Sequence, residues 1–356
     1  MKYRAEIDGL RALAVLPVIL FHAGFGWFSG GFIGVDIFFV ISGYLITTIL
    51  IEDIEKKQFS IVSFYVRRAR RILPALFAMV IVCIIFGWFI LTPYFYRDLF
   101  QTTTAISIFS SNILLFIKSG YFSAISELKP FLHTWSLAVE EQYYLIFPIF
   151  LILVWRFGKN RVLWIIVGLA IISLLLSEWT WRNNPSANFY LAHTRAWELL
   201  AGSITAFIMQ TNGPKKNDIL AMIGLAAIII SIFVYDESTP IPSVYALVPV
   251  LGVVLFILFA DQSTLAAKIL STKLFVGIGL VSYSAYLWHQ PVFSFMRHLT
   301  LEELTDFNYI VAILIITVLS VLSWRFIERP FRNKKLVSDK IIFNSSILAI
   351  MIIGII

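Results

Sequence analysis

Charged residues are scarce in this chain of 356 residues: Asp, Glu, Lys and Arg together make up 14%, whereas an ordinary soluble domain carries about 25%. The mean hydropathy of +0.87 leaves too little polar surface to cover a water-soluble protein of this size. Cys83 is the only cysteine, so no internal disulfide can form. The sequence also lacks an internal repeat, a Gly/Ser-rich linker and a low-complexity tract. These absences exclude a soluble enzyme, a disordered protein and a disulfide-stabilised secreted domain.

Apolar runs fill most of the sequence. A transmembrane helix needs about 17–25 mostly apolar residues, and twelve runs are candidates. They lie at roughly 8–25, 33–51, 72–91, 102–117, 142–156, 162–178, 191–209, 219–235, 244–260, 274–295, 308–326 and 341–356. The sequence therefore predicts an all-α polytopic membrane protein.

The basic residues indicate how many of these runs cross the membrane. Most of the 28 Lys and Arg residues, which give the chain its net charge of +7, fall into clusters that the positive-inside rule places in the cytoplasm. The clusters lie at 2–11, 52–71, 156–161, 215–216, 268–273 and 325–340. Twelve crossings would put the cluster at 156–161 outside, whereas eleven crossings keep every cluster inside. The most polar run, 102–117, is therefore predicted to be a re-entrant or interfacial segment.

This topology gives the chain two chemically different sides. With eleven transmembrane helices, the N-terminus lies in the cytoplasm and the C-terminus outside. Residues 1–335 are predicted to form one membrane domain, because no linker interrupts them. We expect the natural protein to continue beyond Ile356, which lies within an apolar run.

Ionisable side chains inside membrane helices are costly and are therefore candidates for function. Arg11 and His22 lie eleven residues apart, which is about 16 Å along an α-helix and places both on one face. Asp36 follows a glycine pair at 30–31, where a tight turn would let its carboxylate orient the imidazole of His22. Simpler interpretations stay open: a satisfied core histidine, and a carboxylate stabilised by a helix N-terminus.

A run of arginines follows the second apolar segment, within the sequence FYVRRARR at 64–71. Its members are Arg67, Arg68, Arg70 and Arg71. The simpler interpretation is a topology signal that contacts anionic lipid headgroups. The more specific interpretation is a binding site for the phosphates of a nucleotide-containing cofactor.

Further polar side chains interrupt the later apolar runs. They are His133, Glu140 and Glu141 at the outer rim of one span, Arg195 and Glu198 within another, and His289 two residues before the proline of a third. We predict that they line a substrate site. The alternatives are solvated carboxylates at the membrane boundary and, for the arginine and glutamate three residues apart, a structural ion pair.

Several long stretches, in order, resemble the acyltransferase family 3 membrane enzymes, which include O-acetylases of lipopolysaccharide O-antigen and of peptidoglycan. The matching stretches are RAEIDGLRALAV at 4–15 with FH at 21–22, GGFIGVDIFFVISGYLIT at 30–47, FYVRRARRILPA at 64–75, HTWSLAVEEQYYLIFP at 133–148, RAWELLAG at 195–202, SYSAYLWHQP at 282–291 and ERPFR at 328–332. Together they extend over nearly the whole chain.

The resemblance implies acetyl-CoA as a cytoplasmic donor and a carbohydrate hydroxyl, most simply of O-antigen, as the periplasmic acceptor in a bacterial inner membrane. The family's basic-x10-histidine signature falls on Arg11 and His22. Its arginine-x-x-arginine motif falls on Arg67 with Arg70 or on Arg68 with Arg71. Members often carry one further helix and an external SGNH-type domain, so 336–356 is expected to begin a linking helix after a ten-helix core.

The implied mechanism has the arginine run hold the coenzyme A phosphates, with Arg11 near the entrance. His22 would be the general base, oriented by Asp36. Donors for the oxyanion are Arg195, His289 or backbone amides. An acyl-enzyme on a hydroxyl such as Ser42 or Tyr44 is the alternative chemical route.

Two other classes compete with an acyltransferase. A transporter or flippase of a lipid-linked glycan often shows inverted repeats and paired broken helices, and the sequence shows neither. A non-enzymatic scaffold is disfavoured by the number of ionisable groups in apolar segments. The expected partners are membrane lipid and a carbohydrate acceptor, with no metal and no nucleic acid. The acceptor hydroxyl, the acyl length and the oligomeric state stay open.

Overall fold

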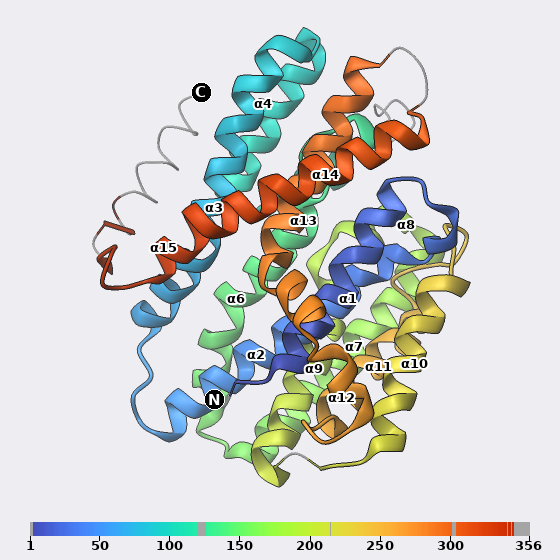
Figure 1. The fold of residues 1–356 in the computed structure, drawn as a ribbon. Helices are drawn as coiled ribbons and strands as arrows, with labels where there is room; N and C mark the ends of the chain where they lie inside the picture. The colour runs from blue at the N-terminus through green and yellow to red at the C-terminus, as the bar shows by residue number, and fades with distance from the viewer. Residues whose placement is uncertain are drawn as a thin grey trace. The chain divides into compact units, whose positions relative to one another are not determined.

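The fold is described by a computed structural model that covers residues 3–119, 126–213, 215–300, 304–339, 341–342 and 344. Every regular element in these ranges is a helix, which confirms the predicted all-α class (Figure 1). The α-helices are α1 (Ala5–His22), α2 (Gly34–Glu55), α3 (Ile61–Ile90), α4 (Pro93–Ser107), α5 (Ser111–Ile117), α6 (Thr134–Trp155), α7 (Lys159–Asn183), α8 (Pro185–Tyr190), α9 (Ala192–Asn212), α10 (Asp218–Val234), α11 (Leu247–Phe259), α12 (Leu265–Leu270), α13 (Lys273–Leu299), α14 (Asp306–Ser323) and α15 (Arg329–Arg332). Short helical turns η1 (Gly26–Phe28), η2 (Gly31–Ile33), η3 (Ser126–Leu128) and η4 (Val244–Ala246) join them, and the π-helical turn η5 (Trp324–Glu328) links α14 to α15.

The chain folds into two compact units, each built from two separate stretches of sequence. Unit 1 comprises Met1–Gln58 and Val139–Leu280, and unit 2 comprises Phe59–Ala138 and Val281–Ile356. Helices α6 and α13 each contribute residues to both units.

Helix length and composition support a polytopic membrane protein. In the described ranges, five helices are long and apolar enough to cross a membrane: Gly31–Glu55, Ile61–Ile90, Thr134–Trp155, Lys159–Asn183 and Asp306–Arg332. Shorter apolar helices cover Asp218–Val234 and Val244–Phe259. The other predicted spans, apart from those at 102–117 and 341–356, coincide with α1, α9 and α13. The run at 341–356 lies almost entirely outside the described residues.

The predicted re-entrant or interfacial run at 102–117 is interrupted in the structure. Helix α4 ends at Ser107 and α5 begins at Ser111, and between them Phe109 has a positive φ of 54°. The 15 residues of α4 extend about 22 Å, less than the roughly 30 Å of a bilayer core. Neither helix is therefore long enough to cross a membrane alone, and the re-entrant or interfacial placement of this segment stays a prediction.

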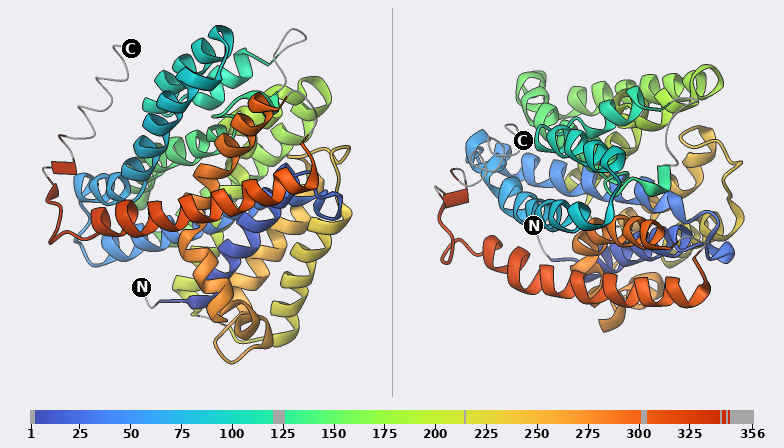
Figure 2. Two further views of the ribbon diagram at one scale, coloured as in Figure 1. Left: turned by 45° about the horizontal axis from the view of Figure 1, so that its top comes forward. Right: turned by 90° about the horizontal axis from the view of Figure 1, so that it is seen from above.

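Glycines bring the helices of unit 1 into close contact. A Cβ on Gly43 of α2 would lie 1.9 Å from the carbonyl oxygen of Leu199, and a Cβ on Gly202 of α9 would lie 2.0 Å from that of Val40. Small residues at such contacts let helix backbones approach in apolar surroundings. Helices α10 and α11 lie side by side in the same way (Figures 1 and 2), with Gly224 against the carbonyl of its partner helix.

Unit 2 contains the long helix α3, from which α4 turns back after a two-residue connection (Figures 1 and 2). The C-terminal turn η5 and the short helix α15 pack against α3. This packing brings the arginine run on α3 next to residues near the end of the described chain.

The glycine contact between α2 and α9 yields a stability prediction. We expect Gly43→Ala to destabilise the protein by about 1–3 kcal/mol, because the added methyl group meets a backbone carbonyl that cannot move independently. The matched control is Gly168→Ala in α7, where an added Cβ has nothing within 4 Å and helix propensity favours alanine. Thermal unfolding in detergent should show a lower midpoint for Gly43→Ala alone. Equal midpoints for the two variants would contradict the close contact.

Candidate functional site

The candidate residues are distributed over both units. Unit 1 holds Arg11, His22, Asp36, Glu140, Glu141, Arg195 and Glu198, whereas unit 2 holds Arg67, Arg68, Arg70, Arg71, His133 and His289. Within each unit, the structure brings some of them into contact and gives others partners that the sequence did not predict.

His22 is the last residue of α1, and its side chain is half-buried. Its Nδ1 lies 2.8 Å from the carbonyl oxygen of Val18, one turn earlier on the same helix. A carbonyl only accepts hydrogen bonds, so this contact favours the tautomer with the proton on Nδ1 and the lone pair on Nε2. The imidazole can therefore accept a proton at Nε2. Arg11 lies on the same helix, 3.6 Å from the carboxylate of Asp8.

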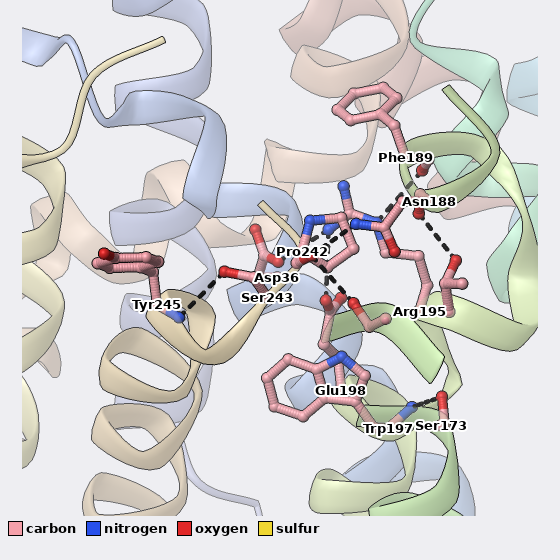
Figure 3. A network of polar contacts seen from close by, with 12 residues as sticks. Asp36, Ser173, Asn188, Phe189, Arg195, Trp197, Glu198, Pro242, Ser243 and Tyr245 are labelled. Atoms are coloured by element: carbon pink, nitrogen blue, oxygen red, sulfur yellow. Dashed lines mark hydrogen bonds and ion pairs between the residues drawn. The ribbon is translucent and has the colours of Figure 1, made fainter. Parts of the chain in front are cut away.

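Asp36 is held by Arg195 (Figure 3). Arg195 Nη1 lies 2.9 Å from Asp36 Oδ1 and 3.3 Å from Glu198 Oε1. The side chains of these residues are only 2%, 1% and 0% exposed, in the order Arg195, Asp36 and Glu198. The structure thus joins two predicted candidates from α9 to one from α2, and the carboxylate predicted to orient His22 binds a guanidinium.

Neighbouring residues fix this buried charge cluster in place. Arg195 Nε donates to the carbonyl of Phe189 over 3.3 Å, and the guanidinium carbon lies 5.2 Å from the centre of the Phe189 ring, within the range of a cation–π contact. Asn188 in turn donates to the carbonyl of Pro242 over 2.6 Å, and Thr194 donates to the carbonyl of Asn188. The short helix α8 and the segment before η4 therefore hold the cluster on this side (Figure 3).

The cluster contains one guanidinium and two carboxyl groups. A buried ion pair is stable only when its charges are compensated and hydrogen-bonded. Arg195 is therefore the central member, since each carboxyl group depends on it for an opposite charge. Such an arrangement can fix helix positions or present a charge to a substrate.

Glu140 on α6 joins a second polar network in unit 1. Its Oε1 accepts hydrogen bonds from the hydroxyl groups of Ser42 on α2 and Tyr144 on α6. Five residues further along α2, Thr47 donates to Ser203 over 2.8 Å. Glu141, the neighbouring candidate, is half-buried.

The sequence did not reveal the contact between Ser42 and Glu140, because the residues are 98 positions apart and no local spacing links them. The contact places a carboxylate beside one of the two hydroxyl groups considered for an acyl-enzyme. The other, Tyr44, receives a hydrogen bond of 3.2 Å from Arg4. The two hydroxyl groups therefore have different partners.

In unit 2, His133 and His289 form an aromatic cluster with Tyr286. The ring centres of the histidines are 5.2 Å apart, and Tyr286 lies 5.5 Å from His133 and 5.2 Å from His289. His289 Nδ1 lies 2.6 Å from the carbonyl oxygen of Tyr286, and the Tyr286 hydroxyl lies 2.6 Å from that of Ser136. Both histidines are buried. The structure thus brings together two candidates that the sequence places 156 positions apart.

The arginines on α3 have unequal environments. Arg70 is 3% exposed, and its Nε and Nη2 lie 3.0 and 2.5 Å from Asp339 Oδ1. Its Nη1 donates to the carbonyl of Phe331 over 3.1 Å. The Arg68 guanidinium lies 5.9 Å from the ring centre of Phe64, while Arg67 and Arg71 are half-buried.

Asp339 is a partner that the sequence did not reveal. Its hydrogen bond with Arg70 holds the pKa of this exposed carboxyl below its usual range, so it stays ionised at neutral pH. The pair shows that a guanidinium of this run can bind an anionic oxygen. Across the described ranges, no group of three or more His, Cys, Asp or Glu side chains is arranged to hold a metal ion.

Comparison with known proteins adds family evidence to this geometry. Residues 4–327 match a family described as "Acyltransferase domain". The chain is 37% identical over 352 residues to the peptidoglycan O-acetyltransferase OatA of Listeria monocytogenes, covering 93% of this chain and 56% of that protein. It is 32% identical over 350 residues to the O-acetyltransferase OatA of Staphylococcus aureus, covering 94% of this chain and 58% of that protein. The chain thus spans little more than half the length of these relatives. No solved structure matches it.

The charge balance of the buried cluster yields a prediction. Arg195→Met should lower the free energy of unfolding by about 3–5 kcal/mol, because it leaves two buried carboxyl groups without an opposite charge. Glu198→Gln keeps the shape and removes one negative charge, so its effect should be much smaller. Thermal and chemical unfolding in detergent would measure both. A larger loss for Glu198→Gln than for Arg195→Met would contradict a cluster organised around the arginine.

Proposed function

Since this chain belongs to the acyltransferase family that it matches over residues 4–327, we propose that it is a membrane O-acetyltransferase that moves an acetyl group from acetyl-CoA to a carbohydrate hydroxyl. The observation that carries the proposal is the family match together with His22, whose Nδ1 is held by a backbone carbonyl. An imidazole fixed in this way carries its lone pair on Nε2, the atom from which a general base acts.

The arginine run on α3 is proposed as the donor site. Coenzyme A carries phosphate groups, and the planar fork of arginine pairs with phosphate through two hydrogen bonds. Arg67, Arg68 and Arg71 supply charge on the same helix, and the contact of Arg70 with Asp339 supports anion binding at this position. Arg11 keeps its proposed place near the donor's entrance.

The acceptor is proposed to be a cell-envelope glycan. One relative is named a peptidoglycan O-acetyltransferase, which favours a peptidoglycan hydroxyl over the O-antigen expected from sequence. Glu140, Glu141, His133, Arg195, Glu198 and His289 stay the proposed substrate-site residues. The contacts within each unit support them as two groups, one built around Arg195 and one around His289.

The proposed step is a direct acyl transfer. His22 Nε2 takes the proton of the acceptor hydroxyl while its oxygen attacks the thioester carbonyl carbon. A C–O bond forms, the C–S bond breaks, and the coenzyme A thiolate leaves and receives the proton that His22 took from the acceptor. Asp36 does not bind His22 in this scheme, because its carboxylate binds Arg195. Its proposed effect on His22 is indirect, by fixing the start of α2. A hydrogen-bond donor to the developing oxyanion lowers the barrier, and Arg195 or His289 are its proposed sources.

The proposed topology places the N-terminus in the cytoplasm and the C-terminus in the periplasm of a bacterial inner membrane. The acyltransferase domain is proposed to extend over 1–335, and the linking helix expected at 336–356 lies largely outside the described residues. The start of α1 would then face the donor side, and its His22 end the acceptor side.

His22→Ala tests the general base. Transfer from acetyl-CoA to a peptidoglycan preparation should fall by about 10²–10⁴-fold, the usual contribution of general base catalysis, while coenzyme A binding is retained. The matched control is His193→Ala, which alters an exposed histidine of the same unit and should keep near-normal transfer. Normal transfer by folded His22→Ala would remove His22 from the mechanism. The acceptor assignment has its own test: if the wild-type protein acetylates O-antigen but not peptidoglycan, the acceptor is O-antigen.

Asp339→Asn tests the donor site. If Arg70 binds a donor phosphate, Asp339 competes with it, so the substitution should lower the Kd for coenzyme A several-fold, as expected for a charge-assisted contact worth about 1 kcal/mol. Arg70→Gln should raise the Kd. The charge-matched control is Asp306→Asn, at the start of α14 in the same unit. If titration calorimetry gives equal Kd values for all variants, the arginine run does not bind the donor and serves only as a topology signal.

A further inference from the structure

A cleft opens in unit 1 next to the end of α1 that carries His22. Its volume is about 430 Å³, within the range of about 300–1,000 Å³ typical of small-molecule sites. Two short segments line it, one that runs from the end of α1 onward and one that follows α10. The lining residues are Phe21, Gly24, Phe25, Gly26, Ser29, Asp236, Glu237 and Ser238.

Hydrogen bonds hold the two walls of the cleft together. The Gly30 amide donates to the carbonyl of Ile232 over 3.0 Å, and the Ser29 hydroxyl donates to the carbonyl of Tyr235 over 2.6 Å. A Cβ on Gly30 would lie 2.2 Å from the carbonyl oxygen of Ser231, so only glycine permits this approach. The cleft is therefore part of the folded unit, with walls fixed relative to each other.

The chemistry of the lining is selective. Phe21 and Phe25 offer aromatic surface, and the Phe21 ring lies 5.2 Å from the ring of His22. Asp236 Oδ1 accepts hydrogen bonds from the amide and the hydroxyl of Ser238 over 2.9 and 2.6 Å. These bonds hold the pKa of Asp236 below its usual range, so its carboxylate is an acceptor at neutral pH. Glu237 adds a second exposed carboxyl group, and among the residues that the structure describes, none of those lining the cleft is basic.

A sugar ring matches this combination. The C–H face of a pyranose packs on an aromatic ring, and its hydroxyl groups donate to carboxylate oxygens, which only accept when ionised. Two carboxylates without a cation disfavour an anionic ligand by like-charge repulsion, and such repulsion is a common source of specificity. The same repulsion disfavours binding of a phosphorylated donor such as acetyl-CoA in this cleft.

We propose that this cleft binds an uncharged sugar unit of the acceptor glycan beside His22 and discriminates against acidic sugars. The inference rests on the proposed function and deepens it, because it adds Phe21, Phe25, Asp236 and Glu237 as acceptor-binding residues. The bound unit lies at the end of α1 from which the general base acts.

The test uses two probes that differ by one charge. They are the disaccharide of N-acetylglucosamine and N-acetylmuramic acid with a free lactyl carboxylate, and the same disaccharide with that carboxylate converted to an amide. Titration calorimetry with the full chain in detergent should give a Kd about three- to tenfold lower for the amide, the size expected for repulsion between solvent-exposed charges.

The variants locate this preference. Asp236→Asn combined with Glu237→Gln should abolish it. Glu237→Lys should remove most of it, because the new cation offsets the remaining charge of Asp236, and Phe25→Ala should weaken the binding of both probes. The control is Glu55→Gln, which removes an exposed carboxyl group at the C-terminal end of α2 and should leave both Kd values unchanged. Unfolding temperatures would verify that each variant is folded, and exposed Glu237 makes its substitution compatible with folding.

Failure of the inference and failure of the proposed function give different results. Equal Kd values for the two probes, or a preference that Glu237→Lys leaves unchanged, would overturn the cleft as the acceptor site even if the protein transfers acetyl groups. Discrimination between the probes by wild-type protein, removed by the cleft variants, supports the cleft even if no acetyl transfer is detected. The absence of acetyl transfer would then count against the proposed reaction and not against the cleft.

Discussion

The contact between Arg195 and two carboxyl groups is the constraint on which unit 1 depends most directly. In a chain with so few charges, one guanidinium that is 2% exposed joins the start of α2 to the start of α9. A charge in such surroundings has no water to stabilise it, so its partners must stay within hydrogen-bond distance. The glycine contacts at Gly43 and Gly202 keep the same two helices close along their length. Polar and steric constraints thus act on one helix pair.

The candidate residues of unit 1 follow from this helix pair. Ser42 and Thr47 lie further along α2 than Asp36, and each has a partner on a neighbouring helix. His22 reaches the end of α1 just before the connection to α2, where the walls of the proposed acceptor cleft are bonded together. Asp36, Ser42 and Thr47 thus each have a hydrogen-bond partner on a neighbouring helix, which limits their freedom to rearrange and favours a preorganised site.

Sequence patterns predicted the helices well because a segment that crosses a membrane is apolar whether or not its side chains are buried in the protein. Lys159–Asn183 and Asp306–Arg332 are examples, since most of their apolar windows are not buried. The run at 33–51 became α2 at Gly34–Glu55, and the run at 219–235 became α10 at Asp218–Val234. Helix ends at the charged side were less predictable, since α3 begins at Ile61, eleven residues before the apolar run at 72–91. The arginines there continue the helix because their long side chains reach polar partners while their stems stay among apolar neighbours. The site was harder still: the pairs Ser42–Glu140 and Arg70–Asp339 join distant positions, and no local periodicity carries that information.

The salt bridge between Arg70 and Asp339 also bears on where this domain can be cut. Family similarity ends at residue 327, and sequence patterning suggested a boundary at 335. A chain shortened to either point would retain a guanidinium that is 3% exposed and lose the carboxylate that neutralises it. Shortening to 327 would also remove the Phe331 carbonyl, a second acceptor for the same guanidinium. A fragment for expression and structural work that keeps this ion pair therefore extends past both sequence-based limits and includes Asp339.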